Sequence, residues 1–177
     1  MDLKGSQTEK NLWAAFAGES QAHMKYLYYA SQAKKDGYVQ ISNIFAETAG
    51  NEKAHAKIWF KLVNGIGDTK ENLAAAAAGE NEEWTSMYPE FARVAREEGF
   101  DKIARLFDAV GKIEKEHDAR YKLLLQKVDE GTVFARDEKI IWQCLNCGYV
   151  CESPKAPMKC PVCDHPQSFF QQVVQNY

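Results

Sequence analysis

Several features are scarce in this 177-residue sequence, and each scarcity excludes a class of protein. No apolar run approaches the roughly 18 residues that a membrane-spanning helix needs. The opening residues, MDLKGSQTEKNLW, do not contain the apolar segment of a signal peptide, so we expect a cytoplasmic protein. The net charge of −3 argues against nucleic acid or an anionic membrane as a partner.

Cysteine is absent from the whole sequence before Cys144, whereas all five cysteines lie between Cys144 and Cys163. Proline follows the same distribution, since four of the five prolines also lie in this last part of the chain. The change in composition predicts a boundary near residues 130–138, with one domain at 1–135 and a second at 136–177. In the reducing cytosol, clustered cysteines bind metal more often than they form disulfides.

Four segments of the first domain carry apolar residues at steps of three or four, the period of an amphipathic helix. The predicted helices cover residues 8–34, 38–64, 69–98 and 101–129. The start of the third helix is open, because the alanine run 74–78 also fits a connector, and Pro89 should kink this helix. Short turns at 35–37 and 99–100 predict two hairpins that pack as an all-α four-helix bundle.

Acidic residues interrupt the apolar stripe of each helix at mid-length. They are Glu19, Glu52, Glu80, Glu83 and Glu114. Glu19 and Glu52 stand at nearly equal distances from the turn between their helices, and so do Glu83 and Glu114, so each pair lies at one level of the bundle. Burying unpaired carboxylates is costly, and no lysine or arginine falls on these stripes. Two metal ions would balance the five charges.

The second and fourth predicted helices also carry histidine. Glu52-Lys-Ala-His55 and Glu114-Lys-Glu-His117 both follow the pattern Glu-x-x-His, whose spacing puts the two side chains on one helical face. A lone core histidine is more often a structural residue, but two that each follow a stripe glutamate favour a ligand role. Glutamates on two helices with Glu-x-x-His on the other two are the ligand set of di-iron and di-manganese carboxylate bundles.

Three neighbours of these acids have weaker assignments. His23 lies one turn beyond Glu19, and its position favours a surface or supporting role. Tyr26 and Tyr88 each lie two turns from a stripe glutamate. Each of these tyrosines is either a hydrogen-bonding partner of a ligating carboxylate or an ordinary core residue.

The second domain contains two Cys-x-x-Cys pairs. They are Cys144/Cys147 and Cys160/Cys163, separated by twelve residues. Two such pairs hold one tetrahedral metal, zinc or iron, and a pair of disulfides is the weaker alternative. The tail alone does not decide between the metals. The bundle favours iron, because an oxygen- or peroxide-reactive di-iron site needs a one-electron donor, and Cys151 is left as a spare thiol.

The two halves together resemble rubrerythrin over essentially the whole chain. The likeness is carried by Glu19, Glu52-x-x-His55, Gly79-Glu80-x-x-Glu83, Met87-Tyr88-Pro89, Glu114-x-x-His117 and the two cysteine pairs. It implies a ferritin-like di-iron bundle followed by a rubredoxin-like domain with one iron on four thiolates. The implied activity is reduction of hydrogen peroxide to water in oxidative stress defence, with electrons from NAD(P)H relayed through separate redox proteins and the rubredoxin-like iron.

The resemblance also implies a role for each ligand. Glu52 and Glu114 would bridge the two irons, with Glu19 and Glu80 as terminal ligands. His117 would hold the second iron, and the first iron would exchange Glu83 for His55 between the oxidised and reduced states. Tyr26 would join the catalytic residues as a hydrogen-bonding partner. A head-to-tail homodimer would bring one chain's rubredoxin-like site near the other chain's di-iron site.

One residue departs from the usual rubredoxin pattern. Asp164 stands where a glycine normally follows the second cysteine pair. Aspartate tolerates left-handed backbone, so we expect a retained fold and an altered redox potential. Two other functions remain open. A ferritin-like ferroxidase would have no need of the rubredoxin-like donor, and a non-enzymatic zinc-ribbon module on a metal-stabilised bundle would be colourless.

Overall fold

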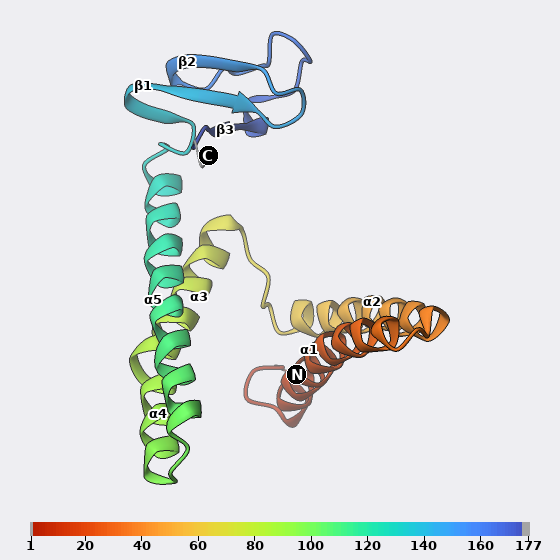
Figure 1. Ribbon diagram of the computed structural model, residues 1–177. Helices are drawn as coiled ribbons and strands as arrows, with labels where there is room; N and C mark the ends of the chain where they lie inside the picture. The colour runs from red at the N-terminus through yellow and green to blue at the C-terminus, as the bar shows by residue number, and fades with distance from the viewer. Residues whose placement is uncertain (1, 175–177) are drawn as a thin grey trace. The chain divides into compact units, whose positions relative to one another are not determined.

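The structure, a computed structural model, describes residues 2–174 of the chain. It consists of two compact units, Met1–Asp68 and Thr69–Tyr177 (Figure 1). Within the described residues, no helix combines the length and the apolar character needed to cross a membrane.

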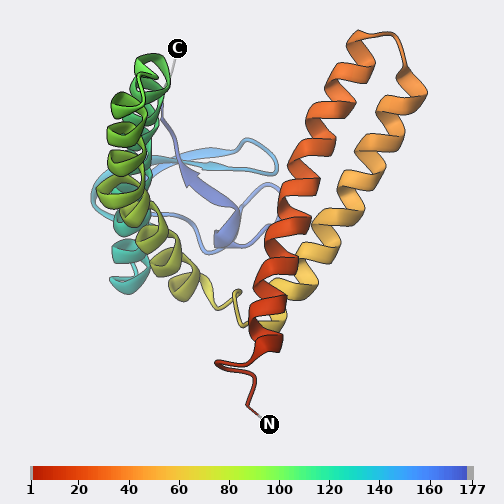
Figure 2. The same cartoon turned by 90° about the horizontal axis from the view of Figure 1, so that it is seen from below.

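The first unit is a hairpin of two helices, α1 (Gln7–Lys35) and α2 (Val39–Leu62), which lie side by side (Figure 2). Helix α1 begins after Ser6, whose hydroxyl accepts a hydrogen bond from the N–H of Glu9 at 3.1 Å and so satisfies a donor of the first turn. The turn contains Gly37 with a φ of +88°, a conformation that glycine adopts at little cost. Both helices match their predicted bounds to within two residues.

Small side chains form the core of this hairpin. Its buried apolar residues, within the part that the structure describes, are Ala30, Ala33, Ala49 and Ala56. The hydroxyl of Ser42 donates a hydrogen bond to the carbonyl of Ala30 at 2.8 Å and ties α2 to α1. Larger apolar side chains such as Ile44 and Ile58 are about half exposed, at 55% and 50%. The hairpin alone therefore has a thin core.

The second unit begins with a long helix that is interrupted once. Its parts are α3 (Thr69–Glu82), the π-helical turn η1 (Glu83–Met87) and α4 (Tyr88–Glu97), which pack against α5 (Asp101–Asp129). The alanine run 74–78 belongs to α3, which settles the start of this helix. The π-helical turn ends two residues before Pro89, which lies in the first turn of α4, where a proline is tolerated because its missing N–H has no helical partner there. Helix α5 has the predicted bounds.

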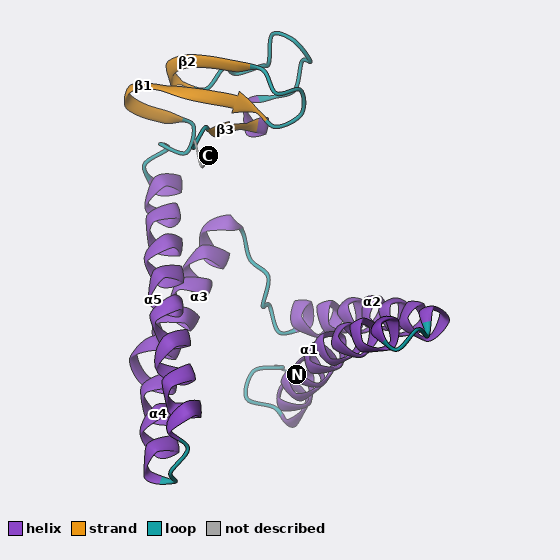
Figure 3. Cartoon of the chain, in the orientation of Figure 1, coloured by secondary structure: helices purple, strands orange, loops and turns teal. Residues whose placement is uncertain are grey.

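Beyond α5 the chain forms a small antiparallel sheet (Figure 3). Strand β1 (Ala135–Cys144) pairs with β2 (Val150–Lys155) on one side and β3 (Phe170–Gln172) on the other, and a 3₁₀ turn, η2 (Gln167–Phe169), leads into β3. The buried core residues are Trp142, Cys144, Ala156, Cys160 and Phe170. Helical hairpins followed by a small cysteine-rich sheet confirm the predicted fold class.

Candidate metal centres

The first hairpin brings together two carboxylates and one imidazole. Glu19 on α1, and Glu52 and His55 on α2, have ligand atoms that all lie within 4.8 Å of one another. The Nδ1 atom of His55 lies 3.0 Å from the carboxylate of Glu52 and 3.9 Å from that of Glu19. Both carboxylates are partly covered, with 17% of the Glu52 side chain and 29% of the Glu19 side chain exposed.

The second hairpin repeats this arrangement. Glu80 on α3, and Glu114 and His117 on α5, form an equivalent group. The Nδ1 atom of His117 lies 2.7 Å from the carboxylate of Glu114 and 3.7 Å from that of Glu80. Burial, followed by the charge of Glu114, raises the pKa of Glu80 above its ordinary value.

Local helix geometry explains both groups. Residues three apart on an α-helix share a face, so each Glu-x-x-His segment presents its carboxylate and imidazole together, and the neighbouring helix adds the third ligand. Among the described residues, histidines alone lie within ion-pair distance of these four glutamates. The converging carboxylates therefore have no lysine or arginine to neutralise them, and a metal ion is the fitting partner. The donor set is that of di-iron carboxylate bundles.

Glu83 lies outside the two three-residue groups. It occupies the first position of η1, one helical turn after Glu80. The charge of Glu83 nevertheless acts on Tyr88, near the second group. Burial, followed by the charges of Glu83 and Glu114, raises the pKa of Tyr88. Tyr88 therefore stands beside these acids, with its phenol held in the protonated form.

The remaining candidates belong to the packing of the first hairpin. The ring of Tyr26 lies 6.1 Å from that of Phe45 on α2, measured between centroids, and Tyr26 is not part of the group around Glu19. The Nδ1 atom of His23 lies 2.7 Å from the backbone carbonyl of Ala49. His23 thus links α1 to α2.

A buried acid beside the second group was not among the predicted ligands. Asp118 directly follows His117 and is only 3% exposed. Its Oδ2 atom accepts hydrogen bonds from Lys122 at 2.8 Å and from Trp84 and Asn81 at 3.0 Å each. These three donors, that of Lys122 first, lower the pKa of Asp118 to about 2. The only sequence signal was an acid one position after Glu-x-x-His, off the apolar stripe, where a solvated side chain is the usual interpretation.

Four thiols converge in the sheet. The Sγ atoms of Cys144, Cys147, Cys160 and Cys163 all lie within 4.8 Å of one another. Two of the separations are 3.7 Å (Cys144 to Cys163) and 3.6 Å (Cys147 to Cys160), and all four cysteines are unpaired. A disulfide needs about 2.0 Å, so the disulfide alternative is wrong. A tetrahedral ion with metal–sulfur bonds of about 2.3 Å puts its sulfurs about 3.8 Å apart, which these thiols fit.

Each Cys-x-x-Cys pair is followed by a residue in left-handed backbone. Gly148 has a φ of +76° and Asp164 a φ of +60°. Their N–H groups donate to the carbonyls of Cys144 and Cys160 at 2.9 and 3.0 Å. Asp164 therefore keeps the backbone that glycine usually supplies, and its carboxylate pairs with Lys159 at 2.7 Å.

The thiols differ in acidity. The backbone N–H of His165 lowers the pKa of Cys163 to about 6. The N–H of Tyr149 also lowers the pKa of Cys147, but burial and the three neighbouring thiols outweigh it and raise that pKa to about 12. Four thiolates therefore need a cation among them. Cys151 packs beside the core and lies outside the four-sulfur group.

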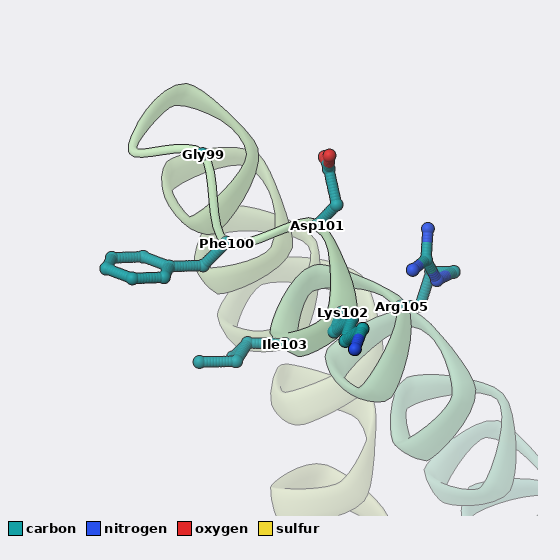
Figure 4. A pocket seen from close by; sticks show the side chains of 6 residues that line it. All are labelled: Gly99, Phe100, Asp101, Lys102, Ile103 and Arg105. Carbon is teal, nitrogen blue, oxygen red and sulfur yellow. The ribbon is translucent and has the colours of Figure 1, made fainter.

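A pocket of about 420 Å³ lies at the turn between α4 and α5 (Figure 4). It is lined by Gly99, Phe100, Asp101, Lys102, Ile103 and Arg105. None of these is a candidate ligand, and Phe100 and Ile103 are 54% and 44% exposed. The pocket is a surface hollow of the turn and is separate from the metal groups.

Comparisons with known proteins agree with both centres. The family model described as Rubrerythrin matches residues 10–125, and the model described as Rubrerythrin, rubredoxin-like domain, matches residues 142–171. The chain belongs to the rubrerythrin family. A rubrerythrin of Porphyromonas gingivalis is 54% identical over 188 residues, which cover 99% of this chain and 94% of that protein. A rubrerythrin of Nitratidesulfovibrio vulgaris is 50% identical, covering 99% and 98%.

A solved structure of partially reduced nigerythrin is also similar in sequence. It is 33% identical and covers 95% of this chain and 87% of that chain, with a TM-score of 0.37. Family membership rests on the sequence relatives. As a member of the family, the chain is an iron-binding oxidoreductase with a ferritin-like di-iron site and one iron in the four-cysteine site.

Proposed function

We propose that the protein is a peroxidase that reduces hydrogen peroxide to water and so protects the cell from oxidative stress. The observation that carries the proposal is the pair of matching carboxylate–imidazole groups, joined in one chain to a four-thiolate site. We assign the di-iron domain to residues 1–135 and the rubredoxin-like domain to 136–177. When bound, the two irons supply the two electrons that O–O cleavage needs, and the four-thiolate iron returns them one at a time.

The two ligand groups would serve one di-iron centre. We propose Glu52 and Glu114 as the bridging ligands because their side chains are the less exposed, at 17% and 14%. The proposed terminal ligands, Glu19 and Glu80, are 29% and 21% exposed. His117 would hold one iron. His55 and Glu83 would be alternative ligands of the other iron, since a carboxylate suits the ferric ion and a neutral imidazole suits the less charged ferrous ion.

Tyrosine side chains near the ligands would complete the site. Reduction of peroxide to water consumes two protons, so neutral hydrogen-bond donors near the ligands favour the reaction. Tyr88 meets this requirement, because burial and the charges of Glu83 and Glu114 keep its phenol protonated. We assign the corresponding role in the first hairpin to Tyr26.

The four-thiolate iron would be the entry point for electrons. We propose that they come from NAD(P)H through separate redox proteins in the cytoplasm. A head-to-tail homodimer would place the four-thiolate site of one chain near the di-iron site of the other.

The test is anaerobic reduction of the iron-loaded full chain, followed by about 1.5 equivalents of hydrogen peroxide per chain, which accept the three electrons of the three ferrous irons. The return of the ferric ions is followed by visible spectroscopy. We expect both ferric chromophores to return rapidly, including the red colour of the ferric tetrathiolate, as the peroxide is consumed. A colourless protein, or one whose irons stay ferrous, would overturn the proposal. Conversion of added ferrous ion to ferric mineral without peroxide consumption would instead support the ferroxidase.

A further inference from the structure

The two helical hairpins correspond residue for residue, with a shift of one position at η1. The sequence interval from Glu19 to Glu80, which ends before η1, is one position shorter than the interval from Tyr26 to Tyr88, which ends after it. The ring contacts confirm the second correspondence, because Tyr26–Phe45 and Tyr88–Phe107 have the same centroid distance of 6.1 Å and the same interplanar angle of 38°.

The second hairpin therefore contains one additional residue within η1. Three residues separate Trp84 from Tyr88, whereas two separate His23 from Tyr26. One extra residue widens a single turn of an α-helix into a π-helical turn, which is rare and frequently marks a functional position. Such a turn needs contacts from outside its own helix to hold it.

Asp118 on α5 provides these contacts. Its Oδ2 atom accepts a hydrogen bond from Asn81, at the end of α3, and another from the indole N–H of Trp84, inside η1. Lys122 donates to the same oxygen. The Oδ1 atom is buried and has no partner among the described residues. One charged oxygen thus links both the end of α3 and the π-helical turn to α5, and hydrogen bonds to an ionised acceptor are the strong ones.

Asp118 and its donors Asn81 and Trp84 each directly follow a proposed metal ligand. The three pairs are Glu80–Asn81, Glu83–Trp84 and His117–Asp118. Successive residues on a helix point about 100° apart, so the hydrogen bonds form a layer beside the ligand face without occupying it. Movement in this layer would move the ligands.

The first hairpin lacks each part of this arrangement and serves as an internal comparison. At the positions of Asn81, Glu83, Trp84 and Asp118 it has Ser20, Ala22, His23 and Ala56. Helix α1 is α-helical throughout, and His23 contacts the backbone carbonyl of Ala49 instead of a carboxylate. The additional carboxylate, the additional residue and the buried acid therefore occur together in one hairpin and are all missing from the other.

We propose that Asp118 is a positioning residue that holds the π-helical turn against α5 and thereby fixes where Glu83 is presented to the metal. The inference rests on the proposed ligand role of Glu83.

Hydrogen–deuterium exchange of the metal-free full chain tests the first half of the proposal. In Asp118→Ala and in Trp84→Phe, amide exchange across residues 81–88 should rise about tenfold or more, as expected for loss of a hydrogen bond to a charged group. Helices α1 and α2 should be unchanged. The matched control is Lys122→Ala, which leaves the bonds from Asn81 and Trp84 intact and should not raise exchange in this segment. Unchanged exchange in both Asp118→Ala and Trp84→Phe would overturn the proposal.

A double-mutant cycle on ferrous-ion affinity, measured anaerobically by chelator competition, tests the second half. Asp118→Ala should weaken iron binding about tenfold in the otherwise unchanged chain, the usual size for a residue that supports a ligand. In a Glu83→Ala background it should weaken binding no further, because the ligand it positions is gone. An equal loss in both backgrounds would contradict the proposal, and Trp84→Phe replaces Asp118→Ala if the latter does not fold.

These readouts are independent of peroxide turnover. A protein that passes both tests but consumes no peroxide would refute the proposed function and leave the role of Asp118 standing. If the protein consumes peroxide but Asp118→Ala changes neither amide exchange nor iron affinity as predicted, the proposed function stands and the role of Asp118 is refuted.

Discussion

Replacing Trp142 with phenylalanine should strongly destabilise the metal-free rubredoxin-like domain while the iron-loaded domain stays folded. Trp142 is 1% exposed, and its indole N–H donates to the carbonyl of Ser153 at 3.0 Å. Phenylalanine loses this hydrogen bond, worth about 1 kcal/mol. It also leaves a cavity where the second ring lay, at about 1–2 kcal/mol. The free energy of unfolding should therefore fall by about 2–3 kcal/mol.

This loss is large for so small a domain. About 40 residues support a stability of roughly 2–6 kcal/mol, so the substitution removes about a third or more of the stability of the metal-free domain. Binding of a structural metal to a small four-ligand site contributes on the order of 10 kcal/mol, which is enough to keep the loaded variant folded.

The assay is near-UV circular dichroism and urea unfolding of the full chain, with and without iron. Val174→Ala is the matched control, because this valine lies in the same domain and is 75% exposed. If the metal-free Trp142→Phe and Val174→Ala proteins unfold at the same urea concentration, the reasoning about this core is refuted.

Three other substitutions give separate checks. Ala49→Leu should overpack the α1–α2 core and lower the free energy of unfolding by about 1–3 kcal/mol, as measured by urea denaturation. The control Ile44→Leu changes an exposed side chain and should leave this free energy unchanged. Equal effects of the two substitutions would contradict the close packing around Ala49. Because the pKa of Asp118 is lowered to about 2, its charge stabilises the fold above the ordinary value of 3.8 and this stabilisation is lost as the pH falls towards about 2. Asp118→Asn should therefore flatten the pH dependence of the melting temperature in that window, and an unchanged slope would argue against the assignment. Cys160→Ser should remove the red chromophore and one iron per chain while the di-iron content stays constant, as metal analysis will show; retention of the red colour would exclude the four-thiolate assignment.

The helices and most of the grouped ligands follow from sequence period alone. The apolar stripe of α5 runs at steps of three or four, and its predicted bounds agree with the structure. The Glu-x-x-His spacing depends only on helix geometry, so Glu114 and His117 had to share a face once α5 formed. The left-handed backbone at Asp164 was likewise predictable, because its position relative to the cysteines requires it.

The π-helical turn and Asp118 were not predictable in the same way. One extra residue shifts the apolar positions that follow it by only one place in the sequence. The series Glu83, Met87, Phe91 still runs at steps of four, so periodicity does not reveal the insertion. The burial of Asp118 depends on donors from another helix, Asn81 and Trp84, and no local pattern on α5 reports them. Both features belong to tertiary packing.

The most direct test of the central claim follows the path of the electrons. In stopped-flow experiments, fully reduced protein is mixed anaerobically with about 1.5 equivalents of hydrogen peroxide per chain, enough to oxidise all three irons. The red ferric tetrathiolate is recorded for the unsubstituted chain and for Glu114→Ala. The substitution removes a proposed bridging ligand and leaves all four cysteines in place. The account predicts rapid return of the red colour in the unsubstituted protein and a persistently reduced tetrathiolate in Glu114→Ala. Equal rates in the two proteins would mean that peroxide oxidises the four-thiolate iron directly, which would contradict the account.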